Sequence, residues 1–250
     1  FTGGINTVKN DLFGVLTING GNFSNTAQYV IMNWNKAEIT AGTFQTLDTA
    51  SAVLFTSAFG SNANYVGELT ISGGEFKHAS DTQEMIVDHY DESNKGNAVV
   101  TGGKFDADIS KYIPTDYVQS ADGTVEKLGE TNAVAKVGGT YYKTLADAVA
   151  AAQDGDTITL LKDAELTSTL NLAKNITIDG QGKYTIKAAN SFTVGSDNKT
   201  YCVLYVSGEV TLKDVTVNGN EKCRVIFCDK GKLTIDGGSL DGKNEVSCGM

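Results

Sequence analysis

The sequence predicts an all-β protein built as a parallel β-helix, a solenoid in which successive coils of chain stack on one another. Two observations carry this prediction. The 250 residues include 28 glycines and a single proline, a composition typical of many short strands joined by tight turns. A motif of alternating strand residues, a small-residue pair and an aromatic residue also recurs along the chain. Such recurrence is the pattern of a repeat fold, whereas an antiparallel sandwich of hairpins does not require it.

The motif occurs four times in the first half of the chain. It reads LTINGGNF at 16–23, EITAGTF at 38–44, LTISGGEF at 69–76 and VVTGGKF at 99–105. The side chains alternate, so one face of each strand would be buried, and the glycines permit positive φ at a sharp corner. The aromatic positions expected to stack between coils are Phe23, Phe44, Phe76 and Phe105. The threonines taken as equivalent anchors are Thr17, Thr40, Thr70 and Thr101.

A looser series of the same motif continues in the second half. It reads ITIDGQG from 176, VTLKDVTVNGN from 210 and LTIDGGSLDG from 233. Its anchors are Thr177, Thr211 and Thr234. A basic coil of about 22 residues, lengthened in places by loop insertions, accounts for both series.

Segments that differ from the repeat predict the ends of coils. Residues 106–128 predict a closing cap, with a helical turn, a break at Pro114 and a hairpin around Asp122 and Gly123. Residues 144–153 predict a short capping helix that begins after Thr144, with Asp147 placed to complete the cap. Its expected buried stripe is Leu145, Ala148, Val149 and Ala152. We therefore expect two parts: coils with a closing cap over 1–128, and an opening helix with coils over 133–250.

Two longer patterns resemble a known superfamily. YYKTLADAVAAAQDGDTITLL (141–161), followed by LNLAKNITIDGQGKYTI (170–186), resembles the opening of right-handed parallel β-helix domains of the pectin-lyase-like superfamily, as found in large surface proteins of Gram-positive gut bacteria. VTGGKFDADISKYIPTDYVQSADGTVEKL (100–128) is similar to the segment that closes such domains. The resemblance implies a right-handed coil and a secreted or cell-wall-attached protein. It implies a fold and transfers no active site.

The order of the two parts leads to an expectation about assembly. The first part has a closing cap and no opening helix, and the second has the reverse. Either the chain is an excerpt across a junction between tandem β-helices, or the coil near Met250 stacks on the coil near Phe1 of another chain, head to tail, in a filament. The open end of a solenoid presents unpaired backbone groups that favour strand pairing.

Composition and motif content argue against several functions. Thirty acidic residues outnumber twenty basic ones, and the net charge is −10, so nucleic acid is not an expected partner. No apolar run approaches a membrane span of roughly 18 residues. We expect no cofactor and no bound metal. The only catalytic candidates are Asp179, Asp214 and Asp236, which could form an outward column, although Asp before Gly is also ordinary turn chemistry. The alternative function is a polysaccharide lyase or glycoside hydrolase acting on acidic or plant or host glycans.

Two further groups of side chains are candidate sites. The four cysteines, Cys202, Cys223, Cys228 and Cys248, lie in the last fifth of the chain. Their spacing permits disulfides 202–223 with 228–248, or 202–228 with 223–248, or buried free thiols. The aromatic residues that lie among polar ones, and that could contact glycans, are Tyr29, Trp34, Tyr141 and Tyr142. We expect a structural or adhesive surface module whose partners are glycans or host surface proteins. A third interpretation is a passive spacer, which lacks such a ligand.

Overall fold

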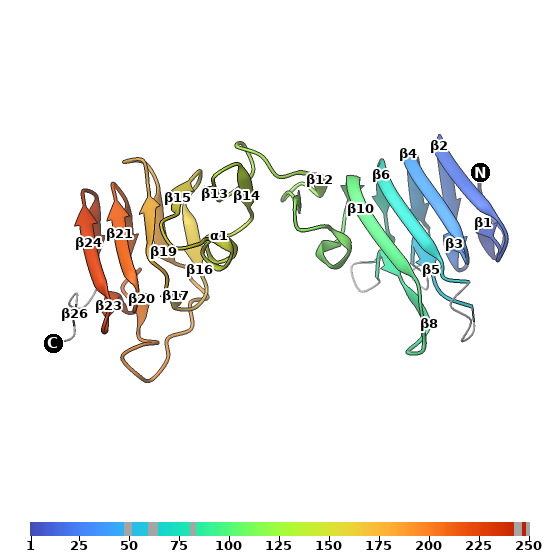
Figure 1. Ribbon diagram of the computed structural model, residues 1–250. Coiled ribbons are helices and arrows are strands. Elements are labelled where there is room, and N and C mark those ends of the chain that lie inside the picture. The colour runs from blue at the N-terminus through green and yellow to red at the C-terminus, as the bar shows by residue number, and fades with distance from the viewer. Residues whose placement is uncertain (48–51, 60–64, 81–83, 243–246, 249–250) are drawn as a thin grey trace. The chain divides into compact units, whose positions relative to one another are not determined.

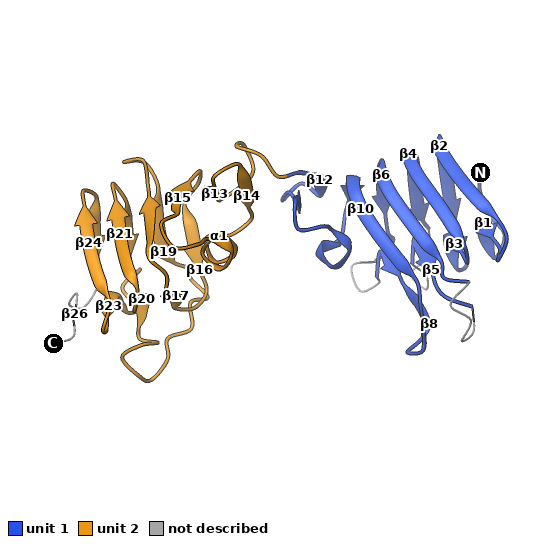
Figure 2. Ribbon diagram, viewed as in Figure 1, with its two compact units in different colours: residues 1–127 blue, residues 128–250 orange. Residues whose placement is uncertain are grey.

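The structure is a computed structural model that describes residues 1–47, 52–59, 65–80 and 84–242, together with the backbone of 247–248. The chain forms two units, Phe1–Lys127 and Leu128–Met250 (Figure 2). Each has its own buried hydrophobic cluster, and each is described by itself. Both are mostly β with parallel sheets. Among the described residues, α1 (Leu145–Ala151) is the single α-helix and η1 (Ser110–Tyr112) the single 3-10 helix.

Unit 1 is built from strands that alternate between two parallel sheets. The first sheet contains β1 (Asn6–Asn10), β3 (Tyr29–Asn33), β5 (Leu54–Thr56) and β7 (Ile86–Val87), in that order. The second contains β2 (Val15–Asn25), β4 (Lys36–Thr46), β6 (Glu68–Lys77) and β10 (Asn97–Phe105), side by side in Figure 1. β8 (His89–Asp91) and β9 (Asn94–Lys95) form a hairpin before β10. One strand of each sheet, with the corner between them, makes one coil.

A ladder of phenylalanine rings runs through unit 1, as the sequence predicts. The ring centroids of Phe23 and Phe44 are 5.1 Å apart, those of Phe44 and Phe76 are 4.8 Å apart, and those of Phe76 and Phe105 are 4.5 Å apart. Phe1 extends the ladder by stacking on Phe23. All of these ring pairs are within 10° of parallel. The inward aromatic positions therefore hold the coils in register.

The register corrects two of the sequence anchors. Thr17 lies opposite Glu38 and not Thr40, and Thr70 lies opposite Val99 and not Thr101. The anchors are wrong by two residues, a shift that keeps each side chain on the same face of the sheet. The buried branched residues and the stacked rings set the register, because both must lie above their counterparts in the next coil.

The closing segment of unit 1 ends its second sheet. β12 (Thr124–Lys127) pairs antiparallel with β10, and β11 (Tyr117–Gln119) pairs antiparallel with β12. Gly123, at the hairpin turn, has a φ of +88°, and a Cβ there would lie 1.9 Å from the carbonyl oxygen of Phe105. The predicted hairpin is confirmed, and η1 stands where the helical turn was expected.

Unit 2 is built from strands that visit three parallel sheets in turn. The first sheet contains β15 (Thr157–Leu160), β18 (Ile176–Asp179), β21 (Glu209–Lys213) and β24 (Lys232–Asp236). The second contains β16 (Ala164–Leu166), β19 (Thr185–Ala188), β22 (Thr216–Asn218) and β25 (Ser239–Asp241). The third contains β17 (Leu170–Leu172), β20 (Cys202–Val206), β23 (Arg224–Cys228) and β26 (Ser247–Cys248). This arrangement is compatible with a parallel β-helix.

The opening segment of unit 2 extends the first sheet beyond β15. β13 (Ala135–Val137) pairs antiparallel with β15 and with β14 (Thr140–Tyr142). The helix α1 follows Thr144, whose hydroxyl oxygen accepts a hydrogen bond from the Asp147 backbone N–H at 3.0 Å, as predicted. The predicted stripe Leu145, Ala148, Val149 and Ala152 is buried.

Candidate functional site

The outer face of the β15–β18–β21–β24 sheet carries a ladder of threonines. Thr157, Thr177, Thr211 and Thr234 lie opposite one another in successive strands. They alternate with inward residues such as Ile178 and Leu212, which are 0% and 1% exposed. The hydroxyls therefore repeat at the strand spacing of about 4.8 Å. The anchors Thr177, Thr211 and Thr234 are confirmed as equivalent.

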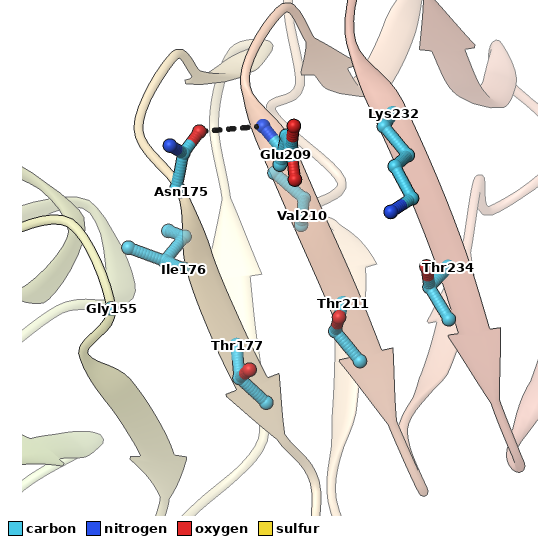
Figure 3. Close-up of a pocket in the computed structure, with 9 residues that line it drawn as sticks. All are labelled: Gly155, Asn175, Ile176, Thr177, Glu209, Val210, Thr211, Lys232 and Thr234. Carbon is cyan, nitrogen blue, oxygen red and sulfur yellow. Dashed lines mark hydrogen bonds between the residues drawn. The ribbon is translucent and has the colours of Figure 1, made fainter.

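A shallow depression of about 200 Å³ lies over this ladder (Figure 3). Its polar lining is Asn175, Thr177, Glu209, Thr211, Lys232 and Thr234. Glu209 lies opposite Lys232 in the neighbouring strand, and the Asn175 side-chain oxygen accepts a hydrogen bond from the Glu209 backbone N–H at 3.0 Å. The depression offers hydroxyl, amide and oppositely charged groups to a polar ligand.

The next row along the same strands contains the expected aspartates, but not as a column of three. Lys213 lies opposite both Asp179 and Asp236, so a lysine stands where Asp214 was expected. Asp214 is one residue further on, at a corner where its φ is +44°. The strand ends one residue earlier than the prediction assumed. The structure therefore brings Asp179 and Asp236 into one row and places Asp214 at the turn beside it.

Asp179 is held in an ion pair. Its Oδ2 lies 2.9 Å from Lys213 Nζ, and its side chain is 18% exposed. Burial works to raise the pKa of Asp179, but the hydrogen bonds from Lys213 and from the Gln181 backbone N–H outweigh it and lower the pKa. A carboxylate with a lowered pKa is ionised at neutral pH and is a poor proton donor.

The cysteines lie in the third sheet of unit 2. Cys202 and Cys223 are buried free thiols, and burial, followed by the nearby Cys223, raises the pKa of Cys202 to about 11. Cys202 lies opposite Arg224, one residue from Cys223. Cys228 lies opposite Cys248 in the neighbouring strand, one coil away. The side chain of Cys248 lies outside the described residues.

The candidate aromatic residues fall in different units. In unit 1, the ring of Phe55 lies 4.8 Å from Tyr29 and 5.1 Å from Trp34, so these two candidates belong to one cluster. The indole of Trp34 is only 8% exposed. Tyr141 and Tyr142 lie on β14 in unit 2, where both are half-buried and Tyr142 packs against the core.

Sequence reasoning missed the exposed members of the unit 1 cluster. The rings of Phe59 and Tyr90 contact Trp34 at centroid distances of 5.6 Å and 6.2 Å. They are 54% and 72% exposed. Their separation in sequence hid the grouping, which appears only once the coils are placed in register.

The described residues contain neither an arrangement of three or more His, Cys, Asp or Glu side chains that could hold a metal ion nor a helix long and apolar enough to cross a membrane. The chain has no significant match among protein-family models, curated proteins or solved structures. What the surfaces can bind must therefore be inferred from their own residues.

Proposed function

We propose that the chain is a non-catalytic structural and adhesive module of a secreted or cell-surface bacterial protein, built as a right-handed parallel β-helix of the pectin-lyase-like kind. The observation that supports this most is the threonine ladder of Thr157, Thr177, Thr211 and Thr234 on the outer face of one sheet. Stacked coils form an extended surface, and such surfaces suit recognition of long ligands. Their cores are continuous, which suits a stiff spacer.

The row of charged residues beside the ladder supports a structural role. Lys213 donates a hydrogen bond to Asp179 at 2.9 Å, so each group is engaged by the other. General acid–base catalysis works best when the pKa of the group lies near the working pH. The pKa of Asp179 is lowered. The pKa of Lys213 is raised, chiefly by its hydrogen bond to Asp179. Both shifts move away from neutrality.

The alternative is a polysaccharide lyase or glycoside hydrolase, and one observation favours it. Three carboxylates lie near Lys213 and raise its pKa, those of Asp179, Asp214 and Asp236. A lysine surrounded by acids is a possible arrangement for binding and cleaving an acidic sugar chain. The depression beside it is shallow and is lined by threonines, however, and offers no carboxyl pair across a cleft.

Depolymerisation assays separate the two functions. Polygalacturonate, neutral plant polysaccharides and host glycans are incubated with the chain, and unsaturated uronates and new reducing ends are measured. We expect no product above that of Asp179→Asn or Lys213→Met. Product formed by the natural chain and lost in both variants would establish the enzyme instead. Asn22→Gln, on an exposed strand of unit 1, serves as the control.

The open edges support assembly with further coils, in another copy or in adjoining tandem domains. In the described part of the chain, β2 and β24 are each the last strand of a sheet. The strand β24 and its corner carry the LTIxGG pattern of β2, and Gly237 and Gly238 have φ of +82° and +78°. Thr2 bridges Ser24, so residues beside the second half of β2 are already in place. The free edge of β2 is its first half.

Sedimentation velocity across a range of concentrations tests association between copies. We expect species that grow with concentration, and we expect Val15→Lys to suppress them, because Val15 is 72% exposed on the free edge and a charge there opposes strand pairing. Val194→Lys, 39% exposed in unit 2, is the matched control. A monomer at every concentration contradicts association between copies and leaves tandem packing as the arrangement.

A further inference from the structure

Aromatic residues occupy the same corner in successive coils of unit 1. This corner leads from the β1–β3–β5–β7 sheet to the β2–β4–β6–β10 sheet. Phe13 lies at this corner in the first coil, Trp34 in the second, Phe59 and Tyr65 in the third, and Tyr90 in the fourth. We call these five residues the aromatic track. No other corner of the described chain repeats aromatic residues in this way.

The rings of the aromatic track contact one another across coils. Trp34 lies at the centre, with its centroid 5.6 Å from that of Phe59 at 87° and 6.2 Å from that of Tyr90 at 51°. Phe13 lies 5.6 Å from Tyr65 at 89°. The Phe59 backbone N–H donates to the Tyr65 carbonyl at 2.9 Å, which joins the two groups. The contacts thus extend over four coils.

These rings remain exposed although they are large and apolar. Phe13 is 81% exposed, Tyr90 72% and Phe59 54%, and none of them belongs to the buried cluster of unit 1. Trp34 is only 8% exposed, and the exposed rings of Phe59 and Tyr90 pack against it. Exposed apolar groups in contact with one another and rimmed by polar residues are typical of binding sites.

The surroundings of the aromatic track select the class of ligand. The charged residues that flank the track in the sequence form ion pairs, Lys9 with Asp11 at 2.8 Å before Phe13 and Lys95 with Glu92 at 3.7 Å after Tyr90, so each of these lysines is paired with a carboxylate. The chain as a whole carries a charge of −10, which repels acidic polymers and anionic lipid surfaces. An uncharged ligand with apolar faces and hydroxyl edges is therefore favoured.

Sugar rings have this chemistry, and a chain of them can span several coils. A pyranose presents C–H groups to an aromatic face and hydroxyls to a polar rim. The exposed rings of Phe13, Phe59 and Tyr90 come from three different coils, so only a chain of several sugar residues can contact more than one of them. We infer that the aromatic track binds an extended, uncharged glycan chain by ring stacking at the corners of successive coils. This inference rests on the proposed adhesive function and names the class of its ligand.

The aromatic track contains its own reporter, because Trp34 is the single tryptophan of the chain. Cello-, xylo- and manno-oligosaccharides are titrated while tryptophan emission is followed, with calorimetry as the second measurement. We expect saturable binding and a shift in emission with at least one neutral series, and affinity that rises with chain length, because the exposed rings lie in three different coils. Polygalacturonate is expected to bind at least tenfold more weakly.

Variants locate the binding. Phe59→Ala with Tyr90→Ala should weaken binding at least tenfold, whereas Tyr90→Trp should retain it and Ile235→Ala, an exposed apolar residue of unit 2 at 47%, should leave it unchanged. Circular dichroism shows whether the double variant keeps its strands. Binding that survives in a folded double variant, binding only of polygalacturonate, or no binding of any neutral series would each overturn the inference. None of these results alters the absence or presence of depolymerised product, so the proposed non-catalytic role is judged separately.

Discussion

The ring of Phe76 lies stacked on that of Phe105, with centroids 4.5 Å apart and 4° between the ring planes. Phe76 is fully buried and also stacks on Phe44, so Phe76→Ala leaves a cavity with rings on both sides. We expect a loss of about 3–5 kcal/mol in the free energy of unfolding of unit 1, measured by urea denaturation. Phe1→Ala is the control, because Phe1 is 80% exposed. Equal losses in the two variants would show that the ladder is not a stacked core.

A buried row of polar side chains also links the coils of unit 1. Asn10 Nδ2 donates to Asn33 Oδ1 at 2.7 Å, and Asn33 Nδ2 donates to Thr56 Oγ1 at 3.1 Å. Asn33→Leu removes both bonds, although Asn10 Nδ2 keeps its bond to the Lys36 carbonyl oxygen at 2.9 Å, and we expect a loss of about 1–3 kcal/mol in the free energy of unfolding.

The double variant Asn10→Leu with Asn33→Leu tests the coupling. It should lose less than the sum of the single losses, because it removes both members of a hydrogen bond. Gln45→Leu, at an exposed position of β4, is the control, with an expected change within about 0.5 kcal/mol. Strictly additive losses in urea denaturation would contradict the buried pairing.

Lys174 fastens the helix of unit 2 to the following coil. Its Nζ donates to the carbonyl oxygens of Val149, Ala150 and Ala152 at 3.1, 2.7 and 2.6 Å. A cation there satisfies the last carbonyls of α1 and complements the helix dipole. We expect Lys174→Met, which keeps the aliphatic stem, to lower the stability of unit 2 by about 1–2 kcal/mol. Hydrogen exchange of the α1 amides should accelerate in this variant and not in Lys183→Met. Unchanged exchange would mean that packing alone holds the helix.

The stability of unit 2 should fall at high pH because of Cys202. Burial raises the pKa of this thiol from 9.0 to about 11 in the folded state. A folded pKa above the unfolded one gives stability that is complete below pH 9 and lost as the pH rises toward 11. Urea midpoints measured from pH 8.5 to 11 should therefore drop less in Cys202→Ser than in the natural chain. Parallel curves would show that the thiol is hydrated in the folded state.

Local chemistry in the sequence was sufficient to predict several elements. The Thr144 cap and its Asp147 partner can be predicted from the sequence because capping depends on residues three apart. The phenylalanine ladder can be predicted because its members occupy the same position in each copy of a short motif. Both signals are contained within a few residues of chain.

Features that depend on register could not be read in the same way. Thr40 and Thr101 were misplaced by two residues because a strand presents the same face every second residue. Lys213, and not Asp214, lies opposite Asp179 and Asp236 because β21 ends one residue earlier than predicted. The grouping of Phe13, Trp34 and Tyr90 required knowledge of which corners coincide after insertions of unequal length. Long-range stacking, and not local propensity, decides these positions.

Cross-linking tests the register of the stacked coils most directly. Thr70 in β6 lies opposite Val99 in β10, and parallel neighbours about 4.8 Å apart lie within disulfide range. Thr70→Cys with Val99→Cys should form a disulfide under mild oxidation, detected by mass spectrometry of linked peptides, and the native cysteines, all beyond residue 201, lie in the other unit. Thr70→Cys with Thr101→Cys, two residues out of register, should form little. Efficient linkage of the second pair, or of neither pair, would contradict the stacked parallel coils on which the account depends.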